Sequence, residues 1–512
     1  MNEKRDNEDL SKKPNILFFF TDDQRFNTIH ALGNDQIYTP TMDKLVKNGV
    51  SFKQAHIPSG SSGAVCMPSR AMLMTGRNLF RIKGAGESIA KEHIMLGEYL
   101  QRHGYYSFGV GKWHNGTQSF NRNHNDGKDI FFGGMADHWN VPVYDYDPSG
   151  KYQGSCPYIK HPLFTNKTHR RKYDHQYQGV HSSEFIANTA IQFLRNYRHE
   201  QPFFLYVSFL APHDPRTMPQ KFLNMYKDKP IALPPNFMVQ HPFNTGELKH
   251  RDERLASRPR KPEEIQRHIK EYFAMISHLD HEIGRVVKIL EELNLMENTI
   301  IILAGDNGLA LGQHGLMGKQ NCYEHSNHVP LIFQGPKIPK SQQTKGFVYL
   351  FDIFPTICDL VGLPIPKTVD GKSMSVLIGD STKILRDEIY YAFHKSQRAL
   401  KTSKYKLIEY VKSGKHIKTQ LFDLESDPWE TDDLSNNPDH SDLIDALRKR
   451  MIKIRNEWEE LETYWGMYFW KSFCKSNPEY MDAKVNSISK ISLRKHQFKR
   501  FKEVIRNFLF QK

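Results

Sequence analysis

The stretch NILFFF (15–20) followed by TDDQR (21–25) decides the fold class of this 512-residue chain. Three further apolar runs have the same form: YYSFGV (105–110) before GKWHNG, FFLYVSFL (203–210) before APHDP, and TIIILA (299–304) before GDNG. Runs that are apolar without alternation, and rich in β-branched or aromatic residues, are typical of strands covered on both faces. The sequence therefore predicts a parallel sheet with polar residues directly after its core strands.

A long helical pattern lies between the third and fourth runs. From 263 to 294, apolar residues such as Ile265, Ile269, Phe273 and Ile276 recur at three- and four-residue spacing. Strands that alternate with helices predict a doubly wound α/β sheet, and such sheets bind ligands at the carboxyl ends of their strands. We therefore expect the polar residues after the four runs to lie together.

The character of the sequence changes near residue 380. EIYYAF (388–393), YKLIEYV (405–411) and TQLFDL (419–424) are separated by turn residues and predict a small antiparallel sheet. Residues 219–262 are rich in Pro, basic and polar residues and predict a long surface loop. The predicted parts are a polar N-terminal tail (1–14), a large α/β domain (15–380), an α+β subdomain (381–483) and a basic C-terminal segment (484–512).

Positive charge is concentrated at the C-terminal end of the chain. The formal net charge is +14, but 484–512 alone hold nine Lys and Arg and one Glu. Net charge therefore gives little support for a nucleic-acid partner, and we expect none. Phe501, Val504 and Phe508 follow helical spacing among basic residues, which predicts an amphipathic helix. Its apolar face is expected to pack on the protein; contact with a membrane surface or a polyanion is the alternative.

The cysteines and the N-terminus limit the class of protein further. Five cysteines without short regular spacing argue against a disulfide scaffold or a zinc cluster. Cys358, within FPTICDLVGL, is predicted to pack in the core. The first fourteen residues are polar, and the apolar run after them is too short for a signal-peptide core or a membrane span. The chain as written predicts a cytoplasmic protein, or a periplasmic or secreted one if a signal peptide has been removed.

Two pairs of oxygen-bearing side chains follow core strands. Asp22 and Asp23 end the first apolar run, and Asp306 and Asn307 end the fourth. Four such oxygens at one sheet edge suit a hard divalent cation such as calcium or magnesium. Each pair alone could be a helix cap or a turn, but two pairs at two strand ends favour a metal site.

Basic side chains are expected in the same layer. One cation and several fixed positive groups would suit a substrate whose anionic group gains charge on its leaving oxygen in the transition state. Taken singly, each of these side chains would be an ordinary surface or structural residue, so the prediction depends on their joint placement. They are Arg70, Lys112, His114, His213 and Lys319.

The segment Cys66-Met67-Pro68-Ser69-Arg70 carries a resemblance to a known family. C-x-P-S-R resembles the sulfatase signature, in which the cysteine is oxidised after translation to formylglycine. TDDQR, GKWH, PHDP and GDNG occur in the family's order, with HGLMGKQ (314–320) following. The resemblance extends over about 15–435 and ends in LFDLESDPWETDDL (421–434). It implies an alkaline-phosphatase-like α/β fold: a mixed, largely parallel sheet sandwiched by helices, with a small C-terminal antiparallel sheet.

The resemblance also implies a role for each residue of the site. One calcium ion would be bound by the two oxygen-bearing pairs, completed by modified Cys66. Arg70 and Lys112 would hold the formylglycine hydrate and the sulfate oxygens. His114 would be the base that expels sulfate from the covalent intermediate. His213 and Lys319 would bind sulfate and assist the departing alcohol.

The chemistry of residue 66 is consistent with that modification. An unmodified thiol is soft and poorly matched to a hard calcium site. A hydrated aldehyde offers one oxygen that can bind the cation and attack, and a second oxygen that becomes the carbonyl oxygen when the aldehyde re-forms. In-line attack on sulfur would release the alcohol, and loss of sulfate would re-form the aldehyde. The expected protein partner is therefore the maturation enzyme that makes formylglycine.

The substrate is less sharply predicted. Residues beside the shared motifs could contact the alcohol part of a sulfate ester, and Arg216 would favour a carboxylate or a further sulfate. Each could equally be an ordinary loop residue. Bacterial sulfatases of this kind commonly act on sulfated carbohydrates, so a sugar sulfate is expected ahead of choline or aryl sulfates. The candidates are Asp214, Arg216, His314, Glu324 and His325.

Two other functions stay open at this point. A phosphonate monoester or phosphodiester hydrolase of the same superfamily would use the same nucleophile. A non-catalytic polyanion-binding protein on this scaffold is suggested by the +14 charge and the basic C-terminal segment. Because no nucleophile, metal ligand or basic group of the family is missing, the sequence favours the enzyme.

Overall fold

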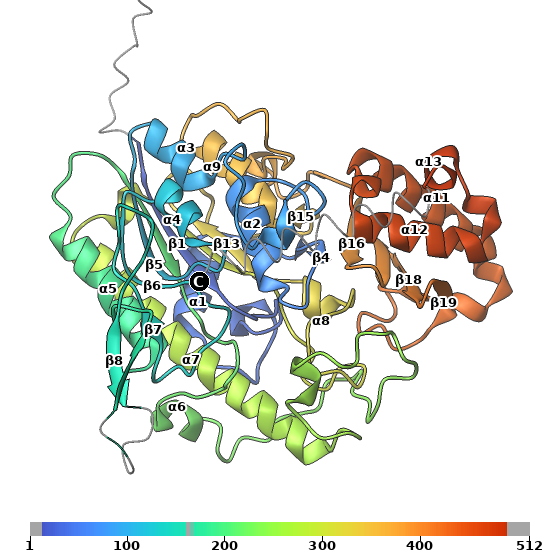
Figure 1. Cartoon of the computed structure of the whole chain (residues 1–512), viewed down its shortest axis with the longest axis horizontal. Helices are drawn as coiled ribbons and strands as arrows, with labels where there is room; N and C mark the ends of the chain where they lie inside the picture. Colours follow the sequence, from blue (N-terminus) through green and yellow to red (C-terminus); the bar gives the residue numbers. More distant parts are fainter. Residues whose placement is uncertain (1–12, 160–164, 166, 489–512) are drawn as a thin grey trace, which may run out of the picture.

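The four predicted core strands are neighbours in one sheet. The protein is described here by a computed structural model that covers residues 13–159, 165 and 167–488. β1 (Asn15–Thr21) lies between β11 (Phe203–Ser208) and β12 (Thr299–Gly305), and β5 (Tyr106–Lys112) follows β11. All three pairings are parallel. Because the strands run the same way, the polar residues after them emerge at one edge of the sheet (Figure 1).

The complete sheet is mixed and largely parallel, as predicted. Only β13 runs antiparallel to its neighbours, β12 and β2. In spatial order the eight strands are β14 (Gln342–Thr344), β2 (Val50–Phe52), β13 (Leu331–Gln334), β12, β1, β11, β5 and β6 (Asp126–Phe131).

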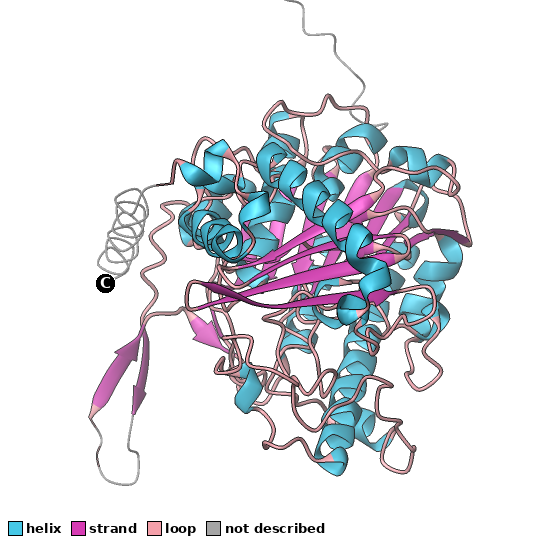
Figure 2. Ribbon diagram, turned by 90° about the vertical axis from the view of Figure 1, so that its right-hand side faces the viewer, coloured by secondary structure: helices cyan, strands magenta, loops and turns pink. Residues whose placement is uncertain are grey.

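Helices cover both faces of this sheet (Figures 1 and 2). Leu17 and Phe19 of β1 belong to one apolar core, whereas Phe18 and Phe20 belong to the other. Alternate residues of a strand point to opposite faces, so a run without polar interruption is what two covered faces require. The first core includes α1 (Pro40–Asn48), α5 (Ser182–Asn196) and α7 (Pro262–Glu292), and the second includes α2 (Cys66–Thr75), α3 (Leu96–Arg102) and α9 (Ile353–Leu360).

A second sheet has five strands. Three of them, β16 (Glu388–Phe393), β18 (Tyr405–Lys412) and β19 (Lys415–Asp423), were predicted, and β17 (Gln397–Thr402) was not. The fifth, β4 (Ser59–Gly60), pairs in parallel with β16. The second sheet thereby holds the chain just before Cys66. α11 (Ser441–Glu457), α12 (Tyr464–Ser476) and α13 (Ala483–Asn486) follow it in the chain.

The prediction of a surface loop over 219–262 holds in part. Before α7 begins at Pro262, the segment is irregular apart from α6 (Gln220–Asn224) and one 3-10 turn, but Asn236, Glu253 and Arg260 are buried, so it does not lie wholly on the surface. Cys358 is fully buried in α9. The predicted basic helix lies within 489–512, outside the residues that the structure describes. No helix within the described ranges combines the length and the apolarity that a bilayer crossing needs. The shorter elements are α4 (Thr117–Asn123), α8 (Glu324–Asn327), α10 (Ser375–Gly379), β3 (Ala55–His56), β7 (Pro142–Val143), β8 (Cys156–Ile159), β9 (Thr168–Arg171), β10 (His175–Gln176) and β15 (Val348–Tyr349).

Candidate active site

The two oxygen-bearing pairs meet at the sheet edge. β1 and β12 pair in register from Asn15 to Thr21, so the residues that follow each strand lie side by side. The backbone N–H of Asp23 donates to Asp306 Oδ1 at 3.0 Å, and Asn307 Nδ2 donates to Asp23 Oδ1 at 2.6 Å. Asp22, Asp23, Asp306 and Asn307 are all buried. The structure therefore brings the four predicted metal ligands together.

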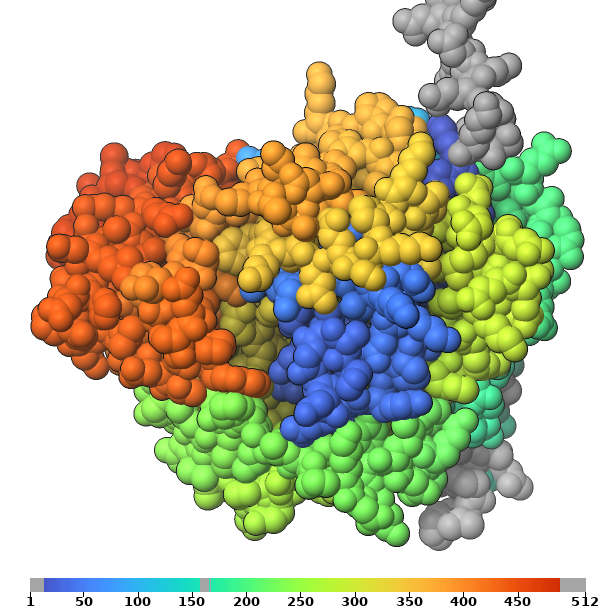
Figure 3. All heavy atoms as spheres, turned by 180° about the vertical axis from the view of Figure 1, so that it is seen from behind, coloured from blue at the N-terminus to red at the C-terminus, as the bar shows by residue number. Residues whose placement is uncertain are grey.

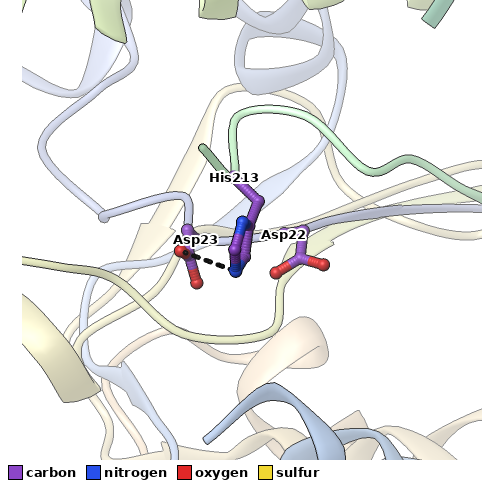
Figure 4. A group of neighbouring side chains, drawn as sticks. All are labelled: Asp22, Asp23 and His213. Atoms are coloured by element: carbon purple, nitrogen blue, oxygen red, sulfur yellow. Dashed lines mark ion pairs between the residues drawn. The ribbon is translucent and has the colours of Figure 1, made fainter. Parts of the chain in front are cut away.

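The oxygens of this cluster fit a hard cation. Asp22 Oδ1 and Asn307 Oδ1 are buried without a hydrogen-bond partner among the described groups, which is costly unless something else binds them. One ligand atom each from Asp22, Cys66 and Asp306 lie within 4.8 Å of one another. The same holds for Asp22, Asp23 and His213, whose ring lies between the two carboxylates in Figure 4. The donor set suits calcium better than a softer metal.

Cys66 begins α2 beside this cluster. It is buried, and its Sγ lies 3.4 Å from His114 Nδ1 and 3.7 Å from Lys112 Nζ. Burial raises the pKa of the Cys66 thiol to about 11. An unmodified Cys66 is therefore protonated at neutral pH, and a protonated thiol is a poor nucleophile and a poor ligand.

Two cations hold the carboxylates in place. Arg70, one turn after Cys66 on α2, donates to Asp306 Oδ2 at 3.1 Å and to Asp22 Oδ2 at 3.3 Å. The Lys112 ammonium donates to Asp22 as well. Burial alone would raise the pKa of Asp22, but the charges of Lys112 and Arg70 hold this pKa well below its usual range.

The pKa of Asp306 is shifted in the opposite direction from that of Asp22. Burial and the neighbouring Asp22 carboxylate raise the pKa of Asp306 to about 7. A divalent cation among these oxygens would favour the ionised form of both carboxyl groups. The electrostatics of the cluster are thus also those of a cation site.

The other predicted basic residues surround the same point. Burial and the charge of Lys112 lower the pKa of His114 well below its ordinary value, so its ring is neutral and can accept a proton. His213 Nε2 lies 3.7 Å from Asp23 Oδ2, the ion pair drawn in Figure 4. The Lys319 ammonium donates to the other oxygen of Asp23. All six residues predicted to be catalytic are therefore gathered around Asp22 and Asp23.

The predicted substrate contacts do not all lie here. Asp214 is next to the site, with Oδ1 3.5 Å from His213 Nδ1. Arg216 approaches His268 at 3.1 Å, and its Nε and Nη2 are buried without a partner among the described groups. His314 instead stacks on Tyr323 at a ring distance of 3.9 Å. Glu324 and His325 lie with it, near the second sheet, so the substrate roles of these three stay predictions without support from their positions.

Two residues at the site were not predicted. Arg251 donates two hydrogen bonds, of 2.6 and 2.7 Å, to the Asp214 carboxylate. It lies in the segment 219–262, which was predicted to be a surface loop. Ser208 accepts a hydrogen bond from Arg70 at 2.7 Å. Ser208 could have been found as the polar residue inside FFLYVSFL, whereas nothing in the sequence points to Arg251.

The fold and this site define an alkaline-phosphatase-like hydrolase. Residues 14–363 match the sulfatase family model, and residues 312–457 match the N-sulphoglucosamine sulphohydrolase C-terminal model. The chain belongs to the sulfatase family and is a sulfatase.

Its relatives have similar lengths. The chain is 27% identical over 482 residues to a sulfatase of Formosa agariphila, covering 88% of this chain and 89% of the relative. It is 29% identical over 467 residues to an arylsulfatase of Clostridium perfringens, covering 86% and 94%. An N-acetylglucosamine-6-O-sulfatase of Bacteroides thetaiotaomicron is 22% identical over 530 residues, covering 88% of each chain.

Two solved structures show the same fold. One is a protein in complex with its substrate, D-glucosamine-2-N,6-O-disulfate, with a TM-score of 0.70, 21% identity, and coverage of 88% of this chain and 98% of that one. The other is a phosphonate monoester hydrolase of Agrobacterium radiobacter, with a TM-score of 0.68, 18% identity, and coverage of 87% and 96%.

Proposed function

We propose that this sulfatase hydrolyses the sulfate ester of a sulfated carbohydrate, using formylglycine made from Cys66 and one bound calcium ion. The observation that carries the proposal is the position of Cys66. It is buried between a neutral His114 and Lys112, beside Asp22, whose carboxylate retains an unpartnered oxygen. The relative that is an N-acetylglucosamine-6-O-sulfatase supports the choice of a carbohydrate.

Each residue then has a defined task. Asp22, Asp23, Asp306 and Asn307 would hold the calcium ion, and residue 66 would complete the site. Calcium would neutralise charge on the sulfate group, and formylglycine would supply the nucleophilic oxygen that a protonated thiol lacks.

The basic residues bind the sulfate group and move protons. Arg70 and Lys112 fix the acidic groups and leave positive charge facing residue 66, where sulfate oxygens would bind. His114 would take a proton from the group at position 66 through Nδ1, which lies 3.4 Å from Cys66 Sγ. His213 and Lys319, beside Asp23, would stabilise the leaving alcohol oxygen.

The rim of the site supports a polar alcohol. Asp214, held by Arg251, offers carboxylate oxygens to sugar hydroxyl groups. Arg216 retains Nε and Nη2 donors, which suit a carboxylate or a second sulfate on the sugar.

Mass spectrometry and a substrate panel test the proposal together. The peptide containing residue 66, taken from the protein made in its native host, should carry the aldehyde mass. Hydrolysis should then be measured on defined sulfated saccharides, with phosphate monoesters, phosphodiesters and phosphonate monoesters assayed in parallel. We expect sulfated saccharides to be the best substrates. Cys66→Ala should fold and bind substrate but lose turnover; retained activity would contradict the mechanism.

The same measurements address the other functions. Faster hydrolysis of a phosphonate monoester or phosphodiester than of any sulfate ester would favour the phosphoryl-transfer alternative, to which the similar fold of a phosphonate monoester hydrolase lends support. An unmodified thiol in the native host would favour the polyanion-binding protein. The complete set of gathered catalytic residues argues for the enzyme.

A further inference from the structure

The carboxylates of Asp22 and Asp23 belong to one cluster although the two residues are consecutive. One ligand atom of each lies within 4.8 Å of the other and of His213 (Figure 4). Successive side chains of an extended strand point to opposite faces, so the chain has to leave the strand conformation at this point. It does so at Asp23, whose φ is +65°. The left-handed conformation of a single residue thus brings the second carboxylate to the site.

That conformation is unfavourable for any residue with a side chain. The Cβ atom is crowded in the left-handed region, which Asp and Asn enter more readily than other residues. A residue keeps such a conformation where its surroundings hold it. The turn is not enclosed on every side, because Arg25 and Phe26 line a cleft of about 1030 Å³. Figure 3 shows this cleft as the hollow between the orange-red C-terminal part and the blue N-terminal part. Contacts from the interior must therefore fix the backbone at Asp23.

Tyr272 of α7 supplies such a contact. Its hydroxyl donates to the backbone carbonyl of Asp23 at 2.6 Å and accepts the backbone N–H of Arg25 at 3.0 Å. One oxygen atom thus bridges both ends of the turn and closes it. Tyr272 is fully buried in the middle of a 31-residue helix, so the position of this oxygen is set by a rigid element. Burial raises the pKa of Tyr272 to about 12, so the hydroxyl keeps the proton that it donates.

We propose that Tyr272 is a positioning residue of the active site, which holds Asp23 in the conformation that binds the metal ion. The Asp23 carboxylate accepts from Asn307 at 2.6 Å and from the Lys319 ammonium, and it lies 3.7 Å from His213. A change in the Asp23 backbone would move this carboxylate away from all three partners at once. The inference rests on the proposed function, because it gives Tyr272 a role in the calcium site proposed there.

A second tyrosine provides a matched control. Tyr226 is 1% exposed, and its hydroxyl bonds Ser277 of α7 at 2.6 Å and accepts the backbone N–H of Tyr38 at 2.9 Å. Like Tyr272, it ties a loop to α7 through one buried oxygen, but both of its partners are outside the active site. Tyr272→Phe and Tyr226→Phe each remove one such oxygen and two hydrogen bonds. A purely structural role would give the two variants the same consequences.

Calcium titration by calorimetry on the full chain separates positioning from stability. We expect Tyr272→Phe to raise the Kd for calcium about tenfold, as the loss of a group that orients a metal ligand does. Tyr226→Phe should change this Kd less than about twofold. Thermal melts of the calcium-free proteins should show a similar decrease in Tm in both variants. A calcium Kd of Tyr272→Phe within about twofold of the unmutated value, or an equal rise in both variants, would overturn the proposal.

Hydrogen exchange provides a readout that needs no metal. In the calcium-free protein, the backbone N–H groups of Gln24 and Arg25 should exchange about tenfold faster in Tyr272→Phe and at an unchanged rate in Tyr226→Phe. Equal rates in Tyr272→Phe and the unmutated protein would also overturn the proposal. If the unmutated protein binds no calcium, the proposed function fails in its metal, and the exchange rates alone decide whether Tyr272 holds the turn. If the unmutated protein binds calcium and hydrolyses sulfate esters while Tyr272→Phe behaves like Tyr226→Phe, only the positioning role fails.

Discussion

Asn307 joins the two strand ends through the nitrogen of its amide. Nδ2 donates to Asp23 Oδ1 at 2.6 Å, and Oδ1 is unpartnered at the cation cluster. Asn307→Asp keeps the shape of the side chain but replaces the donating nitrogen by a carboxylate oxygen, which would then lie about 2.6 Å from the carboxylate oxygen of Asp23. We expect kcat/KM and metal affinity to fall about 10- to 100-fold, measured with the best sulfate ester from the panel and by calcium titration.

The control for this change is Asn294→Asp, at an exposed turn. It should leave kcat/KM and calcium affinity within about twofold of the unmutated values. Near-normal activity and calcium affinity of Asn307→Asp would contradict the role given to this amide.

Arg251 fixes a carboxylate beside the site. Its two hydrogen bonds hold Asp214 next to His213. Arg251→Ala frees that carboxylate, and we expect KM for a sulfated saccharide to rise about fivefold or more with a smaller change in kcat. Arg254→Ala, in the same loop, is the matched control. An unchanged KM would show that Asp214 does not contact the sugar.

At the scale of elements, the end of β5 is built around Gly111. Its φ is +87°, and an added Cβ would lie 1.9 Å from the carbonyl oxygen of Ser208 on β11. Gly111→Ala should therefore destabilise the fold by about 3 kcal/mol or more and reduce activity, because Lys112 and His114 follow directly. Urea unfolding and a sulfate-ester assay would measure both effects.

Gly84→Ala separates the two causes of that loss. Gly84 also has a positive φ, +56°, but nothing lies within 4 Å of an added Cβ. Backbone strain alone should cost about 1 kcal/mol there. Equal losses at the two glycines would mean that the contact with Ser208 is unimportant.

The contact between α7 and α1 is expected to depend on pH. Asp280 of α7 accepts the backbone N–H groups of Thr41 at 3.0 Å and Met42 at 2.7 Å, in the first turn of α1. Burial nevertheless raises the pKa of Asp280 to about 7. In the unfolded chain this carboxyl titrates near about 4, so its contribution to stability is complete below about pH 4 and is lost as the pH rises to about 7.

Asp280→Asn removes that titration. Between pH 5 and pH 8, the Tm of the unmutated protein should fall relative to that of Asp280→Asn, by about 2 to 4 °C. Thermal melts at several pH values would measure the difference, with the exposed Asp432→Asn as control. A difference between the two proteins that does not change with pH would contradict the expectation.

The elements that could be predicted are those whose apolar residues follow directly from burial: strands buried on both faces of the sheet, and one long helix with a buried face. β1, β5, β11, β12 and α7 were all expected within a few residues of their observed bounds. β17, QRALKT, was missed because its charged residues are buried in ion pairs: Arg398 with Glu460, and Lys401 with Glu324. Partners 62 and 77 residues away leave no mark on a local pattern.

At the scale of the whole molecule, the same limit applies to the site. The order of motifs along the chain was enough to select the residues that the structure gathers around Asp22 and Asp23. It was not enough for Arg251, whose partner Asp214 is 37 residues away. The position of His314 also could not be predicted from its closeness in sequence to Lys319, five residues later. Lys319 contacts Asp23 at the site, whereas His314 stacks on Tyr323 near the second sheet.

A buried ion cluster joins the second sheet to the catalytic part. Lys406 of β18 is fully buried and bonds Glu324 of α8 at 3.0 Å and Glu430 at 2.8 Å. Lys406→Met keeps the length of the side chain but removes the cation, leaving Glu430 buried without this partner. Breaking a buried pair on one side typically costs about 3 to 5 kcal/mol. Calorimetry should show a Tm lower by several degrees, whereas Lys415→Met, exposed on β19, should leave Tm nearly unchanged.

The shape of that transition distinguishes two behaviours of the molecule. Because β4 belongs to the second sheet and leads to Cys66, we expect the whole molecule to unfold in one transition. In Lys406→Met, sulfatase activity should therefore be lost at the same temperature as the peak of heat absorption in calorimetry. A separate early transition that leaves 4-nitrophenyl sulfate hydrolysis intact would contradict this coupling. It would mean that the second sheet can unfold while Cys66, held by α2 against Asp306 and Lys112, keeps its place.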